Sequence, residues 1–327
     1  MEIENESIMT AKMSYMGKTI HKTILTVFIL MVCITVAKSQ QDPMFTQYMF
    51  NQLTVNPGYA GSAEVANVMV LNRQQWVGMD GAPKTTNISA DAPIPKIDCG
   101  VGVSLLVDKI GPTKQTGFYV DYSYQLKLSA KAKLGMGLKA GFNYYKANLL
   151  DINTIDENDV AFARNIDGDV KANFGLGFFY YTNNFYAGFS IPKLLNNDLT
   201  TGYSVNNEKL SLSERHYYLI AGKVFVLSET LKFKPSLLTK ITKGAPMQVD
   251  LTANFILYDK FWIGAMYRIG SAFGAMIQIQ LMKTLRIGYA YDYTTTYLNR
   301  FNSGTHEIMV SFDFYTGKNK IRSPRYF

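Results

Sequence analysis

The sequence predicts an all-β protein: a transmembrane antiparallel β-barrel of about 14 strands, with short periplasmic turns and longer surface loops. Three observations predict this fold. Apolar and polar residues alternate in short segments between about residues 64 and 315, the connections alternate between short and long, and a secretion signal precedes the segments. A period of two places alternate residues on opposite faces of a strand, and a barrel in lipid needs an apolar outer face.

The alternation assigns faces to individual side chains. Leu138, Ile277, Ile287 and Phe312 are expected to face lipid. The opposite face, which is rich in glycine and polar residues, is expected to line the lumen and includes Asp121, Lys139, Asp250, Arg268 and Glu307. Arginine is therefore expected to destabilise the barrel at Ile277 and to be tolerated at Gln278.

The predicted strands are evenly distributed along the chain. They span residues 67–77, 84–92, 98–108, 115–127, 132–145, 171–182, 184–191, 214–226, 230–240, 247–257, 260–270, 272–282, 284–294 and 305–315. Every second connection is tight, and the others include the long segments 146–170 and 192–213. Bacterial outer-membrane barrels have an even number of strands and show this alternation, with the long loops outside the cell.

The N-terminal region has the features of a secretory signal. Basic residues precede the apolar segment 24–37, and Ala37-Lys38-Ser39 fits a cleavage site that leaves Gln40 as the first mature residue. The expected organisation is a signal peptide over residues 1–39, an N-terminal periplasmic leader over 40–63, the barrel over 64–315 and a C-terminal tail over 316–327.

Composition supports the barrel over other classes of protein. The chain has 22 Tyr and 20 Phe, residues that form belts at membrane interfaces. The expected outer belt includes Phe118, Tyr119, Tyr144, Tyr145 and Tyr218, and the expected inner belt includes Tyr181, Phe261 and Trp262. A mean hydropathy of −0.03 argues against a helical membrane protein. A soluble β-sandwich is the alternative all-β fold, but its core requires branched aliphatic residues where this chain has aromatics and glycine. The basic residues, with a formal net charge of +8, are dispersed, which argues against nucleic-acid binding.

Several segments together resemble a known family. They are QQDPMFTQYMFNQLTVNPGYAGS (40–62), RQQWVGMDGAPKTTNISADAPI (73–94), FGLGFFYYTNNFYAGFSIPKLL (174–195), KGAPMQVDL (243–251), WIGAMYRIG (262–270), IGYAYDY (287–293), THEI (305–308) and SPRYF (323–327). In their order and spacing they resemble the PorP/SprF family of outer-membrane proteins of the type IX secretion and gliding motility system in Bacteroidetes.

The resemblance implies a function that the strand pattern does not. It implies a non-enzymatic barrel that supports the export or surface retention of an adhesin or similar cargo with a type IX sorting domain. It also implies periplasmic and outer-membrane partners from the same system, in addition to outer-membrane lipid. The alternative is an outer-membrane pore or transporter for a small solute.

The sequence contains little that points to catalysis or cofactor binding. His216 and His306 have no second His or Cys at ligand spacing, which argues against zinc, and no phosphate-binding glycine motif occurs. The nearest approach to a metal site is Asn165, Asp167 and Asp169, oxygen ligands at alternating positions that suggest part of a calcium loop. This segment lacks the distant glutamate of an EF-hand, so a solvated acidic loop is the simpler interpretation.

Candidate partner-binding residues lie on the long loops and at the C-terminal end of the chain. They are Asp151, Asp156, Asp159, Tyr203, Glu208, Lys209, Arg215, Tyr326 and Phe327. A periplasmic face made of residues 40–63 and 316–327 is the rival site. Irregular loops on a rigid scaffold commonly carry function. Three arrangements are possible for the leader. It plugs the lumen, it docks a periplasmic partner, or it is an extended segment under the barrel without either role. Within it, Asn56-Pro57-Gly58 predicts a turn in which Pro57 fixes φ and Gly58 is free to take positive φ.

Overall fold

The computed structural model describes residues 42–63, 65–150, 165–198, 204–205, 208–209 and 211–314. The expected signal peptide, most of the loop 146–170 and the C-terminal tail lie outside these residues. In the described part, no helix is both long enough and apolar enough to cross a membrane.

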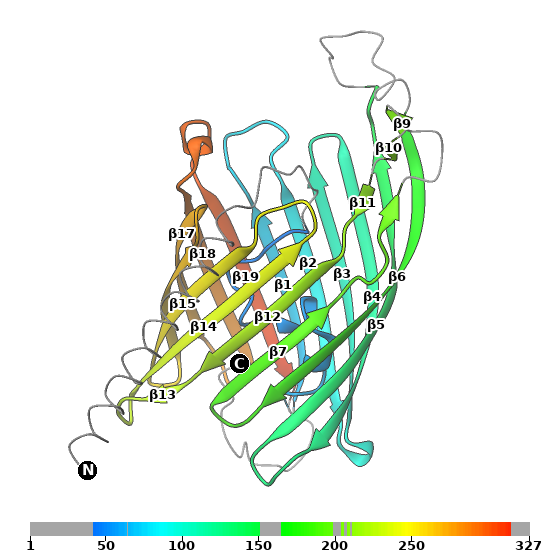
Figure 1. The fold of residues 1–327 in the computed structure, drawn as a ribbon. Helices are drawn as coiled ribbons and strands as arrows, with labels where there is room; N and C mark the ends of the chain where they lie inside the picture. The colour runs from blue at the N-terminus through cyan, green and yellow to red at the C-terminus, as the bar shows by residue number, and fades with distance from the viewer. Residues whose placement is uncertain are drawn as a thin grey trace, which may run out of the picture. The chain divides into compact units, whose positions relative to one another are not determined.

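The strands form one closed antiparallel sheet (Figure 1). They are β1 (Ala66–Gln74), β2 (Lys84–Ile94), β3 (Cys99–Ile110), β4 (Thr113–Lys127), β5 (Lys133–Ala147), β6 (Ile166–Tyr181), β7 (Phe185–Ile191), β12 (His216–Lys223), β13 (Phe225–Val226), β14 (Leu231–Thr242), β15 (Gln248–Leu257), β16 (Phe261–Arg268), β17 (Ala272–Gln280), β18 (Leu285–Thr294) and β19 (Thr305–Phe314). Because β12 and β13 are two parts of one interrupted strand, the barrel has fourteen strands, as the sequence predicts.

Two pairings close the sheet. The first strand pairs with the last, with Val70 of β1 opposite Val310 of β19. On the other side β12 pairs with both β7 and β14. Closure leaves no edge strand, which is the condition for a sheet in hydrocarbon, where unpaired backbone groups cost several kcal/mol each.

The connections differ between the two ends of the barrel. One end, called here the loop end, carries the β1–β2, β5–β6, β7–β12 and β18–β19 connections and lies at the top of Figure 1. Between β7 and β12 the chain forms the short strands β8 (Asn197–Asp198), β9 (Ser204–Val205), β10 (Glu208–Lys209) and β11 (Ser211–Ser213). The opposite end, called the turn end, has tight connections such as the one between β15 and β16. The alternation predicted from the sequence is confirmed.

The predicted facing of the strands is also confirmed. Leu138 and Ile277 are 63% and 44% exposed on the outer face, whereas Gln278 is 1% exposed. The five polar residues predicted to line the lumen are all buried: Asp121, Lys139, Asp250, Arg268 and Glu307. Because Gln278 lies in a filled interior beside Met309, the premise for tolerating arginine there, an open lumen, does not hold, and arginine is instead expected to destabilise the protein.

The interior of the barrel is a packed core. Tyr48, Met49 and Leu53 of the N-terminal segment pack there with inward-facing residues of the wall, including Phe179 and Tyr186. Several aromatics expected in the interfacial belts belong to this core and do not face lipid: Tyr119, Tyr145, Tyr181, Tyr218 and Trp262. Their alternating neighbours, among them Phe118, Tyr144 and Phe261, are exposed on the outer face as expected.

The facing of β17 can be tested with one arginine. Ile277→Arg places a charge on the lipid face within the strand and is expected to lower the free energy of unfolding by ~2–4 kcal/mol. Met282→Arg, in the exposed turn after β17, is the matched control and is expected to cost ~0–1 kcal/mol, because the cost falls toward the interface. The measurement is equilibrium unfolding in lipid vesicles, and equal costs at both positions would contradict the assigned faces.

Candidate functional site

The N-terminal segment, residues 42–63, fills the lumen. It is the dark blue chain within the barrel in Figure 1, and it contains two short 3-10 helices, η1 (Gln52–Thr54) and η2 (Pro57–Tyr59). Residues 45–53 are all buried. Of the places left open by the sequence, the structure therefore puts the described part of the leader inside the barrel as a plug.

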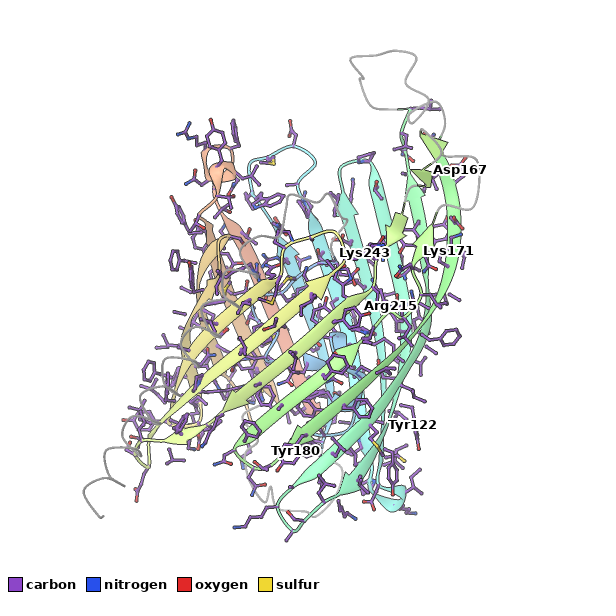
Figure 2. All side chains as sticks on the ribbon, viewed as in Figure 1. Tyr122, Asp167, Lys171, Tyr180, Arg215 and Lys243 are labelled. Atoms are coloured by element: carbon purple, nitrogen blue, oxygen red, sulfur yellow. The ribbon has the colours of Figure 1, made fainter. Side chains whose placement is uncertain are left out.

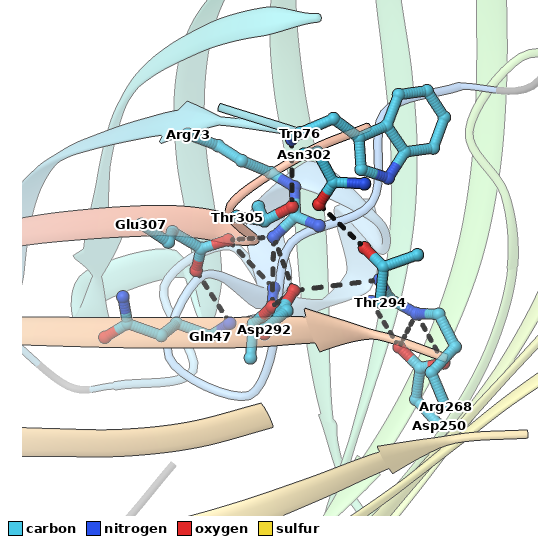
Figure 3. Close-up of polar contacts among 11 residues, drawn as sticks. Gln47, Arg73, Trp76, Asp250, Arg268, Asp292, Thr294, Asn302, Thr305 and Glu307 are labelled. Atoms are coloured by element: carbon cyan, nitrogen blue, oxygen red, sulfur yellow. Dashed lines mark hydrogen bonds and ion pairs between the residues drawn. The ribbon is translucent and has the colours of Figure 1, made fainter. Parts of the chain in front are cut away.

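The first part of the plug is bound by charged groups near the loop end. Glu307 of β19 accepts hydrogen bonds from the backbone N–H groups of Thr46 and Gln47, at 2.9 and 2.8 Å (Figure 3). Arg73 of β1 forms ion pairs with Asp292 at 3.0 Å and Glu307 at 3.1 Å. Hydrogen bonds to ionised groups are the strong ones in a buried setting, so this cluster fixes the height of the plug in the lumen.

Neighbouring ion pairs balance the remaining charge of the wall. The guanidinium of Arg268 donates to both carboxylate oxygens of Asp250, the shortest distance being 2.7 Å (Figure 3). Lys139 pairs with Asp121 at 2.8 Å. Each pair joins adjacent strands in register. Paired charges can be buried because each compensates the desolvation of its partner, which an isolated charge lacks.

The beginning of the described plug is held by a second charged cluster. The Asp42 carboxylate lies 2.7 Å from the ammonium group of Lys193 and 3.6 Å from Nδ1 of His216, and its backbone N–H donates to Nε2 of His216. Burial alone would raise the pKa of Asp42, but the charges of Lys193 and His216 outweigh it and lower the pKa to about 2. Asp42 is therefore ionised at neutral pH. His216 is a structural contact of the plug.

The second part of the plug lies directly against the backbone of the wall near the turn end. Asn56 caps η2 by accepting from the N–H of Gly58, and its amide donates to the carbonyl of Phe178 on β6. Ser123 and Gln125 of β4 donate to the carbonyls of Gly58 and Ala60. The turn predicted at Asn56-Pro57-Gly58 is thus present.

Glycines make this close approach possible. A Cβ atom on Gly137 of β5 would lie 2.2 Å from the nitrogen of Gly58, and one on Gly135 would lie 2.1 Å from its carbonyl oxygen. A Cβ atom on Gly58 would lie 2.8 Å from the carbonyl oxygen of Gly135, and the φ angle of Gly58 is not positive. The predicted reason for this glycine was therefore wrong: the position requires the absence of a side chain. The glycine-rich inner face of β5 and β6 is the surface that contacts the second part of the plug, and it is called here the seat of the plug.

A pocket remains between the plug and the wall. It encloses about 710 Å³, part of it open to solvent, and its lining is mainly apolar. The plug contributes Met44, Phe45 and Tyr48, and the wall contributes Leu106, Tyr218 and Leu238. Its two lysines, Lys139 and Lys193, are paired with Asp121 and Asp42, so the charge of the pocket is balanced.

The predicted partner-binding residues are mostly outside this site. Asp151, Asp156, Asp159, Tyr203, Tyr326 and Phe327 lie outside the described residues. Glu208 and Lys209 form β10, which pairs with β9 beyond the loop end of the barrel (Figure 1). Arg215 is exposed at the start of β12 and donates to the carbonyl of Leu194 (Figure 2). These positions remain predictions.

The oxygen ligands suggested at the start of β6 have other contacts. The side chain of Asn165 accepts from the backbone N–H of Leu150, and Asp169 pairs with Lys171 at 3.2 Å. Asp167 is exposed opposite Lys146. Over the described ranges, no group of three or more Asp, Glu, His or Cys side chains is arranged to hold a metal ion.

Comparison with known proteins identifies the family. The family model described as "Type IX secretion system membrane protein PorP/SprF" matches residues 37–312, so the chain belongs to this family. The protein is thus an outer-membrane β-barrel of the type IX secretion system. No curated protein matches the chain.

Several solved barrels resemble the chain at low identity. Omp33 of Acinetobacter baumannii is 9% identical with a TM-score of 0.45, over 77% of this chain and 98% of its own. The CymD monoaromatic hydrocarbon channel is 13% identical with a TM-score of 0.45, over 86% and 95%. A Pseudomonas aeruginosa FadL homologue is 13% identical with a TM-score of 0.44, over 85% and 96%.

The contact between Glu307 and the first part of the plug can be tested by a substitution at this carboxylate. Glu307→Gln removes the charge that accepts from Thr46 and Gln47, and is expected to cost on the order of 2 kcal/mol. Asp313→Asn is the matched control, since Asp313 is also buried but bonds to Asn67 and Arg286 of the wall. Hydrogen exchange at residues 44–48 should accelerate only in Glu307→Gln. Unchanged exchange there would show that Glu307 does not hold the plug.

The seat of the plug can be tested at a glycine. Gly137→Ala introduces a Cβ against the backbone of residues 57 and 58, which cannot move as a side chain can, and is expected to destabilise the protein by ~1–3 kcal/mol. Ala140→Val, on the outer face of the same strand, is expected to change stability by less than about 0.5 kcal/mol. Thermal unfolding compares the two, and equal stability would refute the role assigned to the glycine face.

Proposed function

We propose that this protein is a non-enzymatic component of the type IX secretion and gliding machinery, which supports the export or surface retention of an adhesin-like cargo with a type IX sorting domain. Membership of the PorP/SprF family is the basis of this proposal. The single structural observation that favours it over a solute pore is the filled lumen, in which residues 45–53 are buried among the wall residues.

A pore requires a continuous open path, which must be polar where the solute is polar. Here Tyr48, Met49 and Leu53 occupy the interior, and the charged groups of the wall pair with one another or with the plug. Conduction would require the displacement of both anchored parts of the plug. A barrel with a fixed plug is better suited to present surfaces at its two ends to other proteins.

The loop end is the proposed cargo surface. It carries the long β5–β6 and β7–β12 connections, on which Asp151, Asp156, Asp159, Tyr203, Glu208, Lys209 and Arg215 are the proposed contacts. The short periplasmic turns and the tail with Tyr326 and Phe327 are left to face other components of the system. Most of residues 42–63 are buried in the lumen, so the leader offers little surface to a periplasmic partner.

Deletion of the gene tests this proposal. General type IX secretion is expected to continue, while at least one large adhesin-like protein disappears from the cell surface, measured by mass spectrometry of surface-digested peptides. Complementation with the Ile277→Leu variant, a conservative change on the lipid face, should restore the cargo. A cargo set that is unaffected by the deletion would refute the proposal.

The rival pore is tested with the same protein in a planar bilayer. The intact protein is expected to give no stable single-channel conductance, and a variant lacking residues 42–62 is expected to conduct. A defined conductance of the intact protein, with an unaffected cargo set, would establish the solute pore in place of the secretion role.

A further inference from the structure

Four lysines form an unbroken row across adjacent strands on the outer face. Lys84 of β2 is opposite Lys109 of β3, Lys109 is opposite Lys114 of β4, and Lys114 is opposite Lys146 of β5. All four are exposed, and all lie where their strands meet the loop end. Strands β2 to β5 lie side by side in Figure 1.

This arrangement is unfavourable without a ligand. Side chains directly opposite on neighbouring antiparallel strands have their Cβ atoms about 4.5–5.5 Å apart, and like charges in this position repel. None of the four lysines forms an ion pair or hydrogen bond with another described residue, although Asp167 is the register partner of Lys146. The nearest carboxylate below the row, Asp108, points inward and accepts from Thr85.

Two lysines at the opposite end of the barrel have carboxylate partners. Lys127 at the end of β4 lies 2.7 Å from Asp98, and Lys232 at the start of β14 pairs with Asp259. These two lysines thus have carboxylates of the chain itself as partners. Because four aligned lysines at the loop end lack such partners among the described residues, the row is suited to take its counter-charge from another molecule.

The surface below the row indicates what that molecule is. Two residues further along each strand, the same register aligns Thr86, Val107, Thr116 and Tyr144. The next row is Ile88, Leu105, Phe118 and Phe142, with the two phenylalanine rings 6.0 Å apart. The order from the rim is thus ammonium groups, then hydroxyl-bearing and small side chains, then an exposed apolar surface. This order matches a phosphorylated headgroup followed by acyl chains.

We infer that the outer face of β2–β5 is a binding site for a phosphorylated glycolipid of the outer leaflet, with its phosphates on Lys84, Lys109, Lys114 and Lys146 and its acyl chains on the surface of Ile88, Phe118 and Phe142. Lysine ammonium groups are common phosphate ligands, and their long apolar stems extend along a membrane surface toward the headgroups. The site is distinct from the lumen and does not depend on the cargo.

The test measures binding of diphosphoryl lipid A in mixed micelles to the purified full-length protein. The variant Lys84→Gln/Lys109→Gln/Lys114→Gln/Lys146→Gln is compared with Lys96→Gln/Lys131→Gln/Lys223→Gln/Lys260→Gln, which removes the same charge from exposed positions elsewhere on the barrel. The first variant is expected to bind about fivefold more weakly for each lysine removed, and the second to bind like the wild type. Enzymatically dephosphorylated lipid A should bind weakly to all three proteins.

Three outcomes of the binding measurement would overturn the inference. The first is equal binding of lipid A by the two variants. The second is binding of phosphatidylglycerol as tight as that of lipid A, which would indicate a general attraction to anionic lipid. The third is complete displacement of lipid A by millimolar inorganic phosphate. Protection of the wild-type lysines from acetylation provides a measurement that does not require the variant to fold. Lipid A is expected to protect the four lysines of the row and not Lys96 or Lys131. Protection by an acidic secreted protein and not by lipid A would likewise overturn the inference and assign the row to a protein partner.

Discussion

The architecture depends on one constraint: a closed sheet in lipid must turn its polar side chains inward, and a filled interior must then satisfy them. Alternation places Asp121, Lys139, Asp250, Arg268 and Glu307 in the lumen, where water would solvate them in an open pore. Here the interior is packed, so each charge requires a protein partner. Cross-strand pairs supply most of these partners, and the plug supplies the rest by donating backbone N–H groups to Glu307.

The plug is bound in two physically different ways. Its first part depends on charged groups. Asp42 forms an ion pair with Lys193, and the backbone N–H groups of Thr46 and Gln47 donate hydrogen bonds to Glu307. Its second part depends on shape, since Pro57 and Gly58 rest on a backbone surface from which side chains are absent. Charged contacts respond to pH, salt and competing ligands, whereas steric fit does not. The two parts therefore differ in what could release them.

The inner and outer faces of the barrel have different roles. The interior holds the plug and gives the loops at the loop end a rigid base. The outer face carries the apolar band and, at its rim, the row of lysines on β2–β5. Glycolipid bound at that row would fix the height and tilt of the barrel in the leaflet, and so the position of the loops at the loop end, which we propose bind the cargo. Both features are consistent with the proposed role of presenting a stable surface to other proteins.

The sequence by itself determined the local structure. A period of two is a property of each strand, so the fourteen strands, their faces and the alternation of turns and loops could be predicted from residues such as Leu138 and Ile277. The resemblance to the PorP/SprF family likewise depends on local segments. What only the tertiary structure decided were contacts between residues far apart in the chain. These include Glu307 with Thr46, Gly137 with Gly58, and the four lysines in one row. The plug contacts depend on where the N-terminal segment lies in the lumen, and the row depends on the exact register of four strands, which a strand pattern with uncertain boundaries does not fix. The inward aromatics Tyr145 and Trp262 were assigned to the lipid belts for a different reason: alternation separates the two faces, but only the packed plug shows that the inner face is also apolar.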